Sequence, residues 1–108
     1  MKPPGQCRSL EEVRSAIDGL DVQIVGLLGR RARYVRAASA FKASPSEVSA
    51  PGRLAAMLEV RRHWAAREGL DPDFVEKLYR EMVAHFISCE MADWKRARNP
   101  GIEHPPDP

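Results

Sequence analysis

The chain has 108 residues, and its 17 lysines and arginines nearly balance its 15 aspartates and glutamates. A net charge of +2 argues against a nucleic-acid-binding protein, which needs a concentrated basic surface. No apolar run approaches the roughly 20 residues of a membrane span, the first ten residues lack the apolar stretch of a signal peptide, and two cysteines make no disulfide framework. We therefore expect a cytoplasmic protein with reduced thiols and one domain.

The first element in chain order is a long amphipathic helix. Residues 1–8 are predicted to be a loose leader because they contain two prolines and a glycine. Ser9 and Glu12 then have the spacing of a capping box, which predicts a helix that begins at Leu10. Apolar residues follow at helical spacing: Leu10, Val13, Ile17, Leu20, Ile24, Leu27 and Leu28. Because no proline occurs before Pro45, the helix is expected to run to about Phe41 or Lys42.

Residues 43–51 carry serines and prolines and predict a loop. A second helix is expected over residues 50–67, and Gly69 suits the position just past its end. Asp71 and Pro72 predict the start of a third helix, which runs to about Arg98. The residues expected on the buried face of the second helix are Leu54, Met57, Leu58 and Trp64.

The domain is thus predicted to be all-α, with three helices over residues 1–98 and a disordered proline-rich tail at residues 99–108. The first helix would be roughly 50 Å long, whereas a globular domain of this length has a radius of gyration of about 13 Å. Its apolar stripe cannot be buried by two shorter helices alone. We therefore expect an interlocked homodimer that pairs the long helices.

A stripe of cations marks the end of the first helix. Arg31, Val35, Ala38 and Lys42 lie at i, i+4, i+7 and i+11, so they share one helix face. Two positive charges separated by small apolar groups are suited to holding a small dianion. Arg14 lies 17 residues before Arg31, or roughly 25 Å along the helix. In an antiparallel helix pair, Arg14 of one chain can approach Arg31 of the other.

No motif for a metal, a nucleotide or a nucleophilic triad is present in the sequence. Glu90 is unusual because it belongs to an otherwise apolar stripe with Val83, Ile87 and Trp94. It is either a buried carboxyl group, which is costly without a partner, or an exposed residue at the edge of the stripe. Several other residues are expected to be inert or solvated: Cys7, Cys89, His63, His85, His104, Arg30, Arg33, Arg36, Arg61, Arg62 and Arg67.

Three segments resemble a known family. GRRARYVRAASAFKAS at 29–44, APGRLAAML at 50–58 and GLDPDFVEKLY at 69–79 are similar to the isochorismate pyruvate lyases, which belong to the all-helical chorismate mutases. The likeness covers about residues 7–98. It implies three helices per chain, an intertwined homodimer, two active sites that each take an arginine from the neighbouring chain, and neither metal nor organic cofactor.

The resemblance also implies residue roles. Arg14 matches the arginine donated across the dimer to a substrate carboxylate, and Arg31 the arginine that holds a carboxylate within the site. Lys42 matches the cation that contacts a carboxylate and the ether oxygen of the substrate. Arg53 matches an arginine near the site, although Gly52 before it replaces a common acidic residue. The implied apolar wall consists of Val35, Ala38, Met57 and Ile87, and residues 43–50 would form a lid over the bound dicarboxylate.

Glu90 stands where the family usually has a glutamine that donates a hydrogen bond to the ether oxygen. An ionised carboxylate there would repel the developing negative charge, so Glu90 can act in this way only when it is protonated. The resemblance favours conversion of isochorismate to salicylate and pyruvate by a concerted pericyclic step. Chorismate mutase, or a mutase of an amino analogue of chorismate, is the runner-up. A non-catalytic helical dimer that binds another protein is the alternative from a different class.

Overall fold

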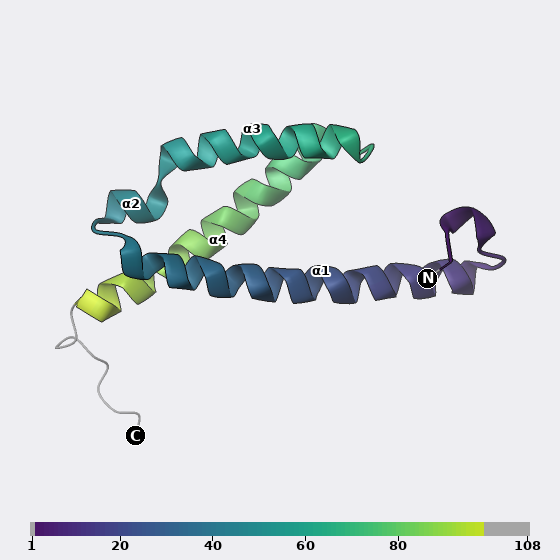
Figure 1. Ribbon diagram of the computed structural model, residues 1–108, viewed down its shortest axis with the longest axis horizontal. Coiled ribbons are helices and arrows are strands. Elements are labelled where there is room, and N and C mark those ends of the chain that lie inside the picture. Colours follow the sequence, from purple (N-terminus) through teal and green to yellow (C-terminus); the bar gives the residue numbers. More distant parts are fainter. Residues whose placement is uncertain (1, 99–108) are drawn as a thin grey trace, which may run out of the picture. The chain divides into compact units, whose positions relative to one another are not determined.

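The computed structural model describes residues 2–98, and within them every regular element is helical. The long helices are α1 (Leu10–Ala38), α3 (Pro51–Arg67) and α4 (Pro72–Arg98), and α2 (Pro45–Ser49) is a short helix between them. Two single turns, η1 (Pro4–Gln6) and η2 (Ser39–Phe41), flank α1 (Figure 1). The predicted all-α class is confirmed, whereas the predicted tail at 99–108 lies outside the described residues.

The chain forms two compact units, divided between Tyr34 and Val35 within α1. The N-terminal unit contains η1 and most of α1. Ser9 accepts a hydrogen bond from the Glu12 amide at 3.1 Å, as the predicted capping box requires. The Glu12 carboxylate reaches one residue further back than expected and accepts from the Arg8 amide at 2.7 Å. This hydrogen bond, followed by that from Lys2, lowers the pKa of Glu12.

The end of α1 differs slightly from the prediction. The α-helix stops at Ala38, and the chain continues as the tighter turn η2 through Phe41. Ser39 Oγ donates a hydrogen bond to the carbonyl oxygen of Arg36 at 2.7 Å, and such side-chain bonds compete with the regular helical pattern. Lys42 then adopts extended backbone, with φ −97° and ψ 134°, and so ends the helical path where the sequence predicted.

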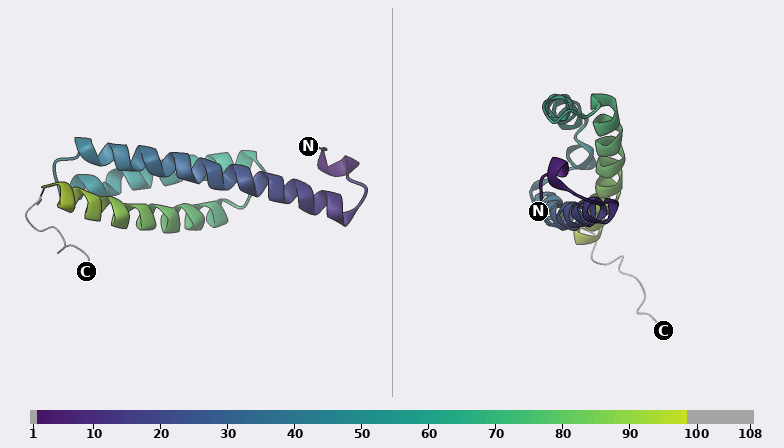
Figure 2. Two further views of the ribbon diagram at one scale, coloured as in Figure 1. Left: turned by 90° about the horizontal axis from the view of Figure 1, so that it is seen from below. Right: turned by 90° about the vertical axis from the view of Figure 1, so that its right-hand side faces the viewer.

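The second unit is organised around a hairpin of α3 and α4, in which α4 runs back in the opposite direction (Figure 2). Gly69 lies in the left-handed region with φ 74° between the two helices, which confirms its predicted role. Asp71 caps α4 by accepting a hydrogen bond from the Asp73 amide at 2.9 Å. The apolar core of this unit is drawn from α2, α3 and α4: Val48, Met57, Leu58, Ala65 and Val75 are buried.

The serines and prolines of residues 43–51 predict a plain loop, but the structure forms the short helix α2 there. Ser44 Oγ accepts a hydrogen bond from the Glu47 amide, and Glu47 in turn accepts one from the Ala43 amide. This second capping box begins α2, and burial of Val48 holds α2 against its unit. Ala50, between α2 and α3, has φ 38°, a left-handed conformation that costs a residue with a Cβ about 1–2 kcal/mol.

Three predictions about the second helix need correction. Trp64 was expected in the core, but it is 43% exposed. Arg61, expected to be a solvated cation, is half-buried with its guanidinium 4.8 Å from the Trp64 ring centre and 5.1 Å from that of Tyr79. Arg62 is also engaged, at 2.8 Å from Asp73 and 3.1 Å from Glu76. Cation–π contacts and ion pairs at the edge of the α3–α4 hairpin account for all three differences.

The carboxylate of Glu76 links two arginines, since Arg80 Nε also donates to it at 2.9 Å. The hydrogen bond from Arg80, supported by Arg62, lowers the pKa of Glu76 from its ordinary value of 4.5. Because the folded-state pKa is the lower one, the stabilisation is present above the unfolded value and is lost as the pH falls through the folded value.

We therefore expect Glu76→Gln to lower the thermal midpoint at neutral pH, and the difference from the unsubstituted protein to shrink below pH 4.5. Thermal unfolding followed by circular dichroism from acid to neutral pH measures this. Glu81→Gln, an exposed change on the same helix, is the matched control. A difference that stays constant down to the most acid pH would contradict the expected linkage.

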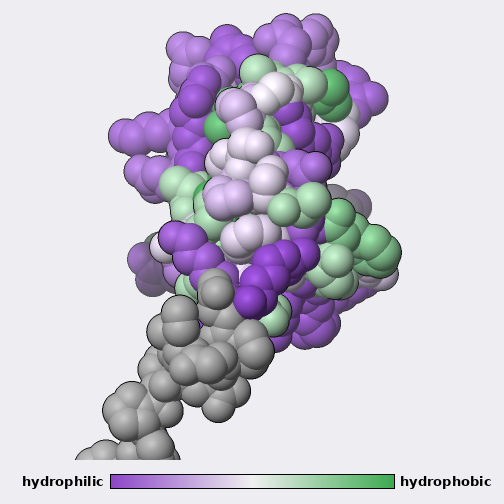
Figure 3. Space-filling model, turned by 90° about the vertical axis from the view of Figure 1, so that its left-hand side faces the viewer, coloured by the Kyte–Doolittle hydropathy of each residue, from purple (hydrophilic) through white to green (hydrophobic). Residues whose placement is uncertain are grey.

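Apolar side chains of the N-terminal unit remain at the surface. No residue of α1 is buried, and Leu10, Ile17, Ile24 and Leu27 are each at least half exposed. A stripe of this kind along a helix favours a partner helix. Elsewhere too, apolar side chains reach the surface among strongly hydrophilic ones, as the face drawn in Figure 3 shows.

Candidate active site

Lys42 and Glu90 form the centre of the candidate site. Lys42 follows η2 directly, and its Nζ lies 2.7 Å from Oε1 of Glu90 on α4. The Glu90 side chain is only 3% exposed and that of Lys42 is 25% exposed. Of the two alternatives for Glu90, the buried one is therefore correct. The sequence placed this carboxyl group among apolar neighbours, and the tertiary fold adds the oppositely charged partner that a buried carboxylate needs.

The backbone of Lys42 is held by the same face of α4. Its carbonyl oxygen accepts a hydrogen bond from Trp94 Nε1 at 2.8 Å and another from Arg98 Nη2 at 2.7 Å. The Arg98 guanidinium also lies 4.4 Å from the centre of the Trp94 ring. Glu90, Trp94 and Arg98 are spaced at i, i+4 and i+8, so they project from one helix face.

The sequence pattern placed Trp94 in an apolar stripe of the third helix and gave neither Trp94 nor Arg98 a part in the site. A signal for them was present in the spacing, because an acid, an aromatic residue and a cation share one stripe near the end of α4. The pattern did not show that this stripe contacts Lys42. That residue lies 52 residues before Trp94 and 56 residues before Arg98.

The residues predicted as an apolar wall come from three helices. Val35 and Ala38 lie in the last part of α1 and are half-buried, as is Ile87 on α4. Met57 on α3 is buried with 5% of its surface exposed. Arg53 lies in the first turn of α3 and is exposed.

Arg14 and Arg31 belong to the N-terminal unit. Arg14 is exposed and Arg31 is half-buried. Both are on the continuous helix α1, where 1.5 Å per residue separates them by roughly 25 Å. Within one chain, no small ligand can contact both guanidinium groups.

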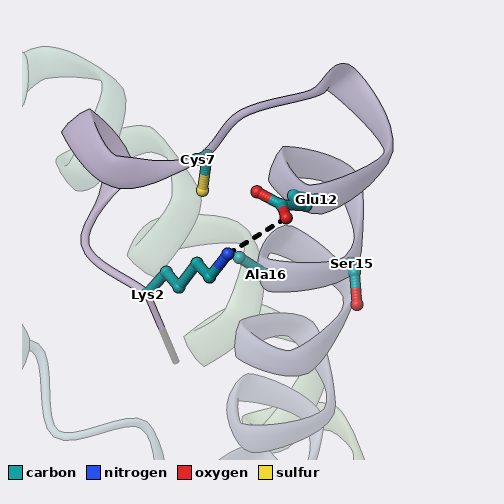
Figure 4. A pocket seen from close by; sticks show the side chains of 5 residues that line it. All are labelled: Lys2, Cys7, Glu12, Ser15 and Ala16. Carbon is teal, nitrogen blue, oxygen red and sulfur yellow. Dashed lines mark hydrogen bonds and ion pairs between the residues drawn. The ribbon is translucent and has the colours of Figure 1, made fainter.

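A pocket in the N-terminal unit has none of the predicted site residues in its lining. Its volume is about 340 Å³, and it is lined by Lys2, Cys7, Glu12, Ser15 and Ala16 (Figure 4). The ion pair between Lys2 and Glu12, at 3.1 Å, spans this pocket. These two charges are therefore already paired with each other.

The remaining sequence candidates are surface residues where the structure describes them. His63, His85 and Cys89 are exposed, Cys7 is half-buried, and His104 lies outside the described residues. Within residues 2–98, no three His, Cys, Asp or Glu side chains gather in a way that could hold a metal ion. In the same part of the chain, no helix has the length and apolarity to cross a membrane.

The Lys42 centre can bind an anion and stabilise developing negative charge. An ammonium group has three N–H donors. The ion pair with Glu90 Oε1 leaves donors of Lys42 for a bound anion. A cation held in a partly desolvated position acts on a ligand far more strongly than one in water, and it requires no reorganisation during a reaction. The centre provides no nucleophile, and it fits reactions that proceed through orientation and charge stabilisation.

Comparison with known proteins agrees with the all-helical fold. Residues 13–91 match the family described as chorismate mutase type II, and this range contains every site residue that the sequence analysis named. The chain belongs to this family. It is also 46% identical over 98 residues to the isochorismate pyruvate lyase of Pseudomonas aeruginosa, a match that covers 91% of this chain and 97% of that protein.

Proposed function

We propose that this protein is an isochorismate pyruvate lyase, which converts isochorismate to salicylate and pyruvate. The observation that carries the proposal is the 46% identity, over nearly the whole length of both chains, to a protein of that name. The Lys42–Glu90 centre supports it, because the chemistry needs a fixed cation and no nucleophile.

Isochorismate is a dicarboxylate with an enolpyruvyl ether. In one concerted step, a ring hydrogen moves to the terminal carbon of the enolpyruvyl group and the ring-to-ether C–O bond breaks. The ring becomes aromatic and leaves as salicylate, while the enolpyruvyl group leaves as pyruvate. Negative charge gathers on the ether oxygen during this step. The protein must therefore fold the enolpyruvyl group of the substrate over its ring and stabilise the ether oxygen.

In this proposal, Lys42 contacts a substrate carboxylate and the ether oxygen. Arg31 binds a carboxylate, for which its planar two-donor fork is suited, and Arg53 lies nearby. Glu90 in its protonated form donates a hydrogen bond to the ether oxygen. The apolar wall formed by Val35, Ala38, Met57 and Ile87 excludes water and so strengthens these electrostatic contacts.

We further propose an intertwined homodimer in which Arg14 of one chain completes the site of the other. The exposed apolar residues of α1 support this, because a second copy of the same helix would cover them. The separation of Arg14 and Arg31 along α1 supports it too, since only a second chain can supply both guanidinium groups to one small substrate. Neither a metal nor an organic cofactor has a role in this mechanism.

Two smaller parts of the proposal concern the lid and the location of the protein. Residues 43–50 act as a lid over bound substrate, and the strained backbone of Ala50 at the end of this segment is a place where it can change conformation. A cytoplasmic location fits the two free cysteines, Cys7 and Cys89.

Glu90 makes the proposed reaction depend on pH. An ionised Glu90 neutralises the charge of Lys42 and repels the ether oxygen, whereas the protonated form does neither. We expect an acid-shifted pH optimum for kcat/KM, and Glu90→Gln to restore activity at high pH because its amide always donates. Initial rates of both proteins from acid to alkaline pH measure the effect. Identical pH–rate profiles would contradict it.

The experiment that tests the function supplies purified protein with isochorismate and with chorismate in parallel. Salicylate fluorescence and pyruvate formation report the lyase reaction, and prephenate formation reports chorismate mutase. Family membership favours the mutase as the second candidate, with an amino analogue of chorismate as its variant. Salicylate only at the uncatalysed rate overturns the lyase, and turnover of neither substrate favours a non-catalytic helical dimer.

A further inference from the structure

The strongest unassigned feature is the pair of hydrogen bonds that α4 makes to the backbone of Lys42. One carbonyl oxygen accepts from the Trp94 indole at 2.8 Å and from the Arg98 guanidinium at 2.7 Å. These donors lie beyond residues 13–91, the part of the chain that matches the family. They contact the main chain of the residue whose side chain the proposed chemistry requires.

Lys42 needs such support because its local backbone does not fix it. It lies between the turn η2, which ends at Phe41, and the helix α2, which begins at Pro45. Its extended conformation continues neither element. The side chain adds four flexible methylene groups between the backbone and the ammonium. A shift of the Cα atom would therefore move the ammonium relative to the substrate.

We propose that Trp94 and Arg98 are positioning residues that hold Lys42 in place for the reaction. The inference rests on the proposed function, because it assigns a role to the site that carries it out. Trp94 supplies a half-buried donor from a rigid ring. Arg98 lies against the face of that ring, with 4.4 Å between guanidinium and ring centre, and supplies the second donor.

The arrangement holds Lys42 at both ends. Glu90 contacts the ammonium at 2.7 Å, and Trp94 and Arg98, one and two turns later on the same face, hold the carbonyl. Because all three partners belong to one helix, they move together. The main chain of Lys42 thus stays attached to α4 even where the neighbouring segment, residues 43–50, changes conformation.

The variants that test this remove the donors and keep the packing. Trp94→Phe removes the indole N–H and retains an aromatic ring, and we expect kcat to fall by about tenfold with a smaller change in KM. Arg98→Met should lower kcat by about threefold, because its exposed hydrogen bond competes with water. Arg98→Lys keeps a donor and should recover most of the loss.

The chain offers a matched control for each variant. Arg96→Met removes the same charge from the same end of α4, but Arg96 pairs with Asp93 at 3.0 Å and not with Lys42. Trp64→Phe makes the same ring substitution at the exposed tryptophan of α3. Both controls should keep the parent kcat. Losses in these controls equal to those in the Trp94 and Arg98 variants would overturn the proposal.

A Lys42→Met background separates positioning from general stability. If Trp94 and Arg98 act through Lys42, their replacement lowers kcat in the parent protein but adds no further loss once the ammonium is gone. Equal fold-losses in both backgrounds overturn the positioning role, because a merely structural effect does not depend on the Lys42 side chain.

A spectroscopic measurement keeps this proposal distinct from the proposed function. The chain has two tryptophans, so Trp64→Phe leaves Trp94 as the only indole in an NMR spectrum. Its N–H should exchange slowly with solvent, and faster after Arg98→Met is added. Slow exchange in a protein that turns over neither isochorismate nor chorismate would overturn the proposed function and support the contact between Trp94 and Lys42. Fast exchange of the Trp94 N–H in a fully active protein would overturn the positioning role and leave the proposed function in place.

Discussion

Lys42→Met is expected to lower kcat/KM for isochorismate by about a thousandfold, the largest effect of any single change in this chain. Lys42 Nζ forms an ion pair with the buried Glu90 carboxylate at 2.7 Å, and the proposed reaction depends on that charge at the ether oxygen. The same substitution removes the partner of Glu90. We therefore also expect it to destabilise the fold by about 2 kcal/mol, less than for a fully enclosed pair because Lys42 is in contact with water.

The double variant Lys42→Met/Glu90→Gln separates these two effects. It removes both charges of the pair, so the thermal midpoint should return close to that of the parent protein while kcat/KM stays low. Lys77→Met, at an exposed position on α4, controls for the loss of one lysine. Recovery of activity in the double variant would show that Lys42 serves only to neutralise Glu90, contrary to the proposed mechanism.

Mixing two inactive variants is expected to restore activity if the site is shared between chains. Arg14→Met and Arg31→Met should each lower kcat/KM by about a hundredfold. A heterodimer of the two has one site with both arginines and one with neither. Random exchange of subunits should therefore give about one quarter of the parent activity. Steady-state rates after co-refolding equimolar amounts measure this recovery.

The matched control mixes Arg14→Met with the double variant Arg14→Met/Arg31→Met. No pairing of these chains brings the two arginines into one site, so co-refolding should restore nothing. Native mass spectrometry establishes that heterodimers have formed in both mixtures. Heterodimers without recovered activity would contradict the shared site, and a monomer in solution would contradict the dimer itself.

Local sequence patterns located the long helices well because their signals are local. The hydroxyl of Ser9 and the carboxylate of Asp71 cap α1 and α4 where the spacing predicted, and Gly69 has the positive φ expected of its position. The short helix α2 was missed although Ser44 and Glu47 repeat the spacing of Ser9 and Glu12. Two prolines and three serines favoured a loop, and burial of Val48, a tertiary contact, holds the helix in place.

Side-chain environments at the α3–α4 hairpin were predicted less well. Hydrophobicity placed Trp64 inside and Arg61 outside, yet Trp64 is 43% exposed and Arg61 lies against its ring. Arg62 likewise found carboxylate partners on the neighbouring helix at Asp73 and Glu76. Pattern analysis treats each helix alone and does not see which charges a second helix brings close.

By itself, the sequence determined the all-helical class and the bounds of α3 and α4 to within a residue, and it singled out Lys42 and Glu90 as candidate site residues. Only the tertiary structure decided that these two meet at 2.7 Å and that Trp94 and Arg98 hold the Lys42 backbone. The physical reason is separation along the chain. Helical periodicity relates residues a few positions apart, whereas contacts across about fifty residues depend on how the helices pack.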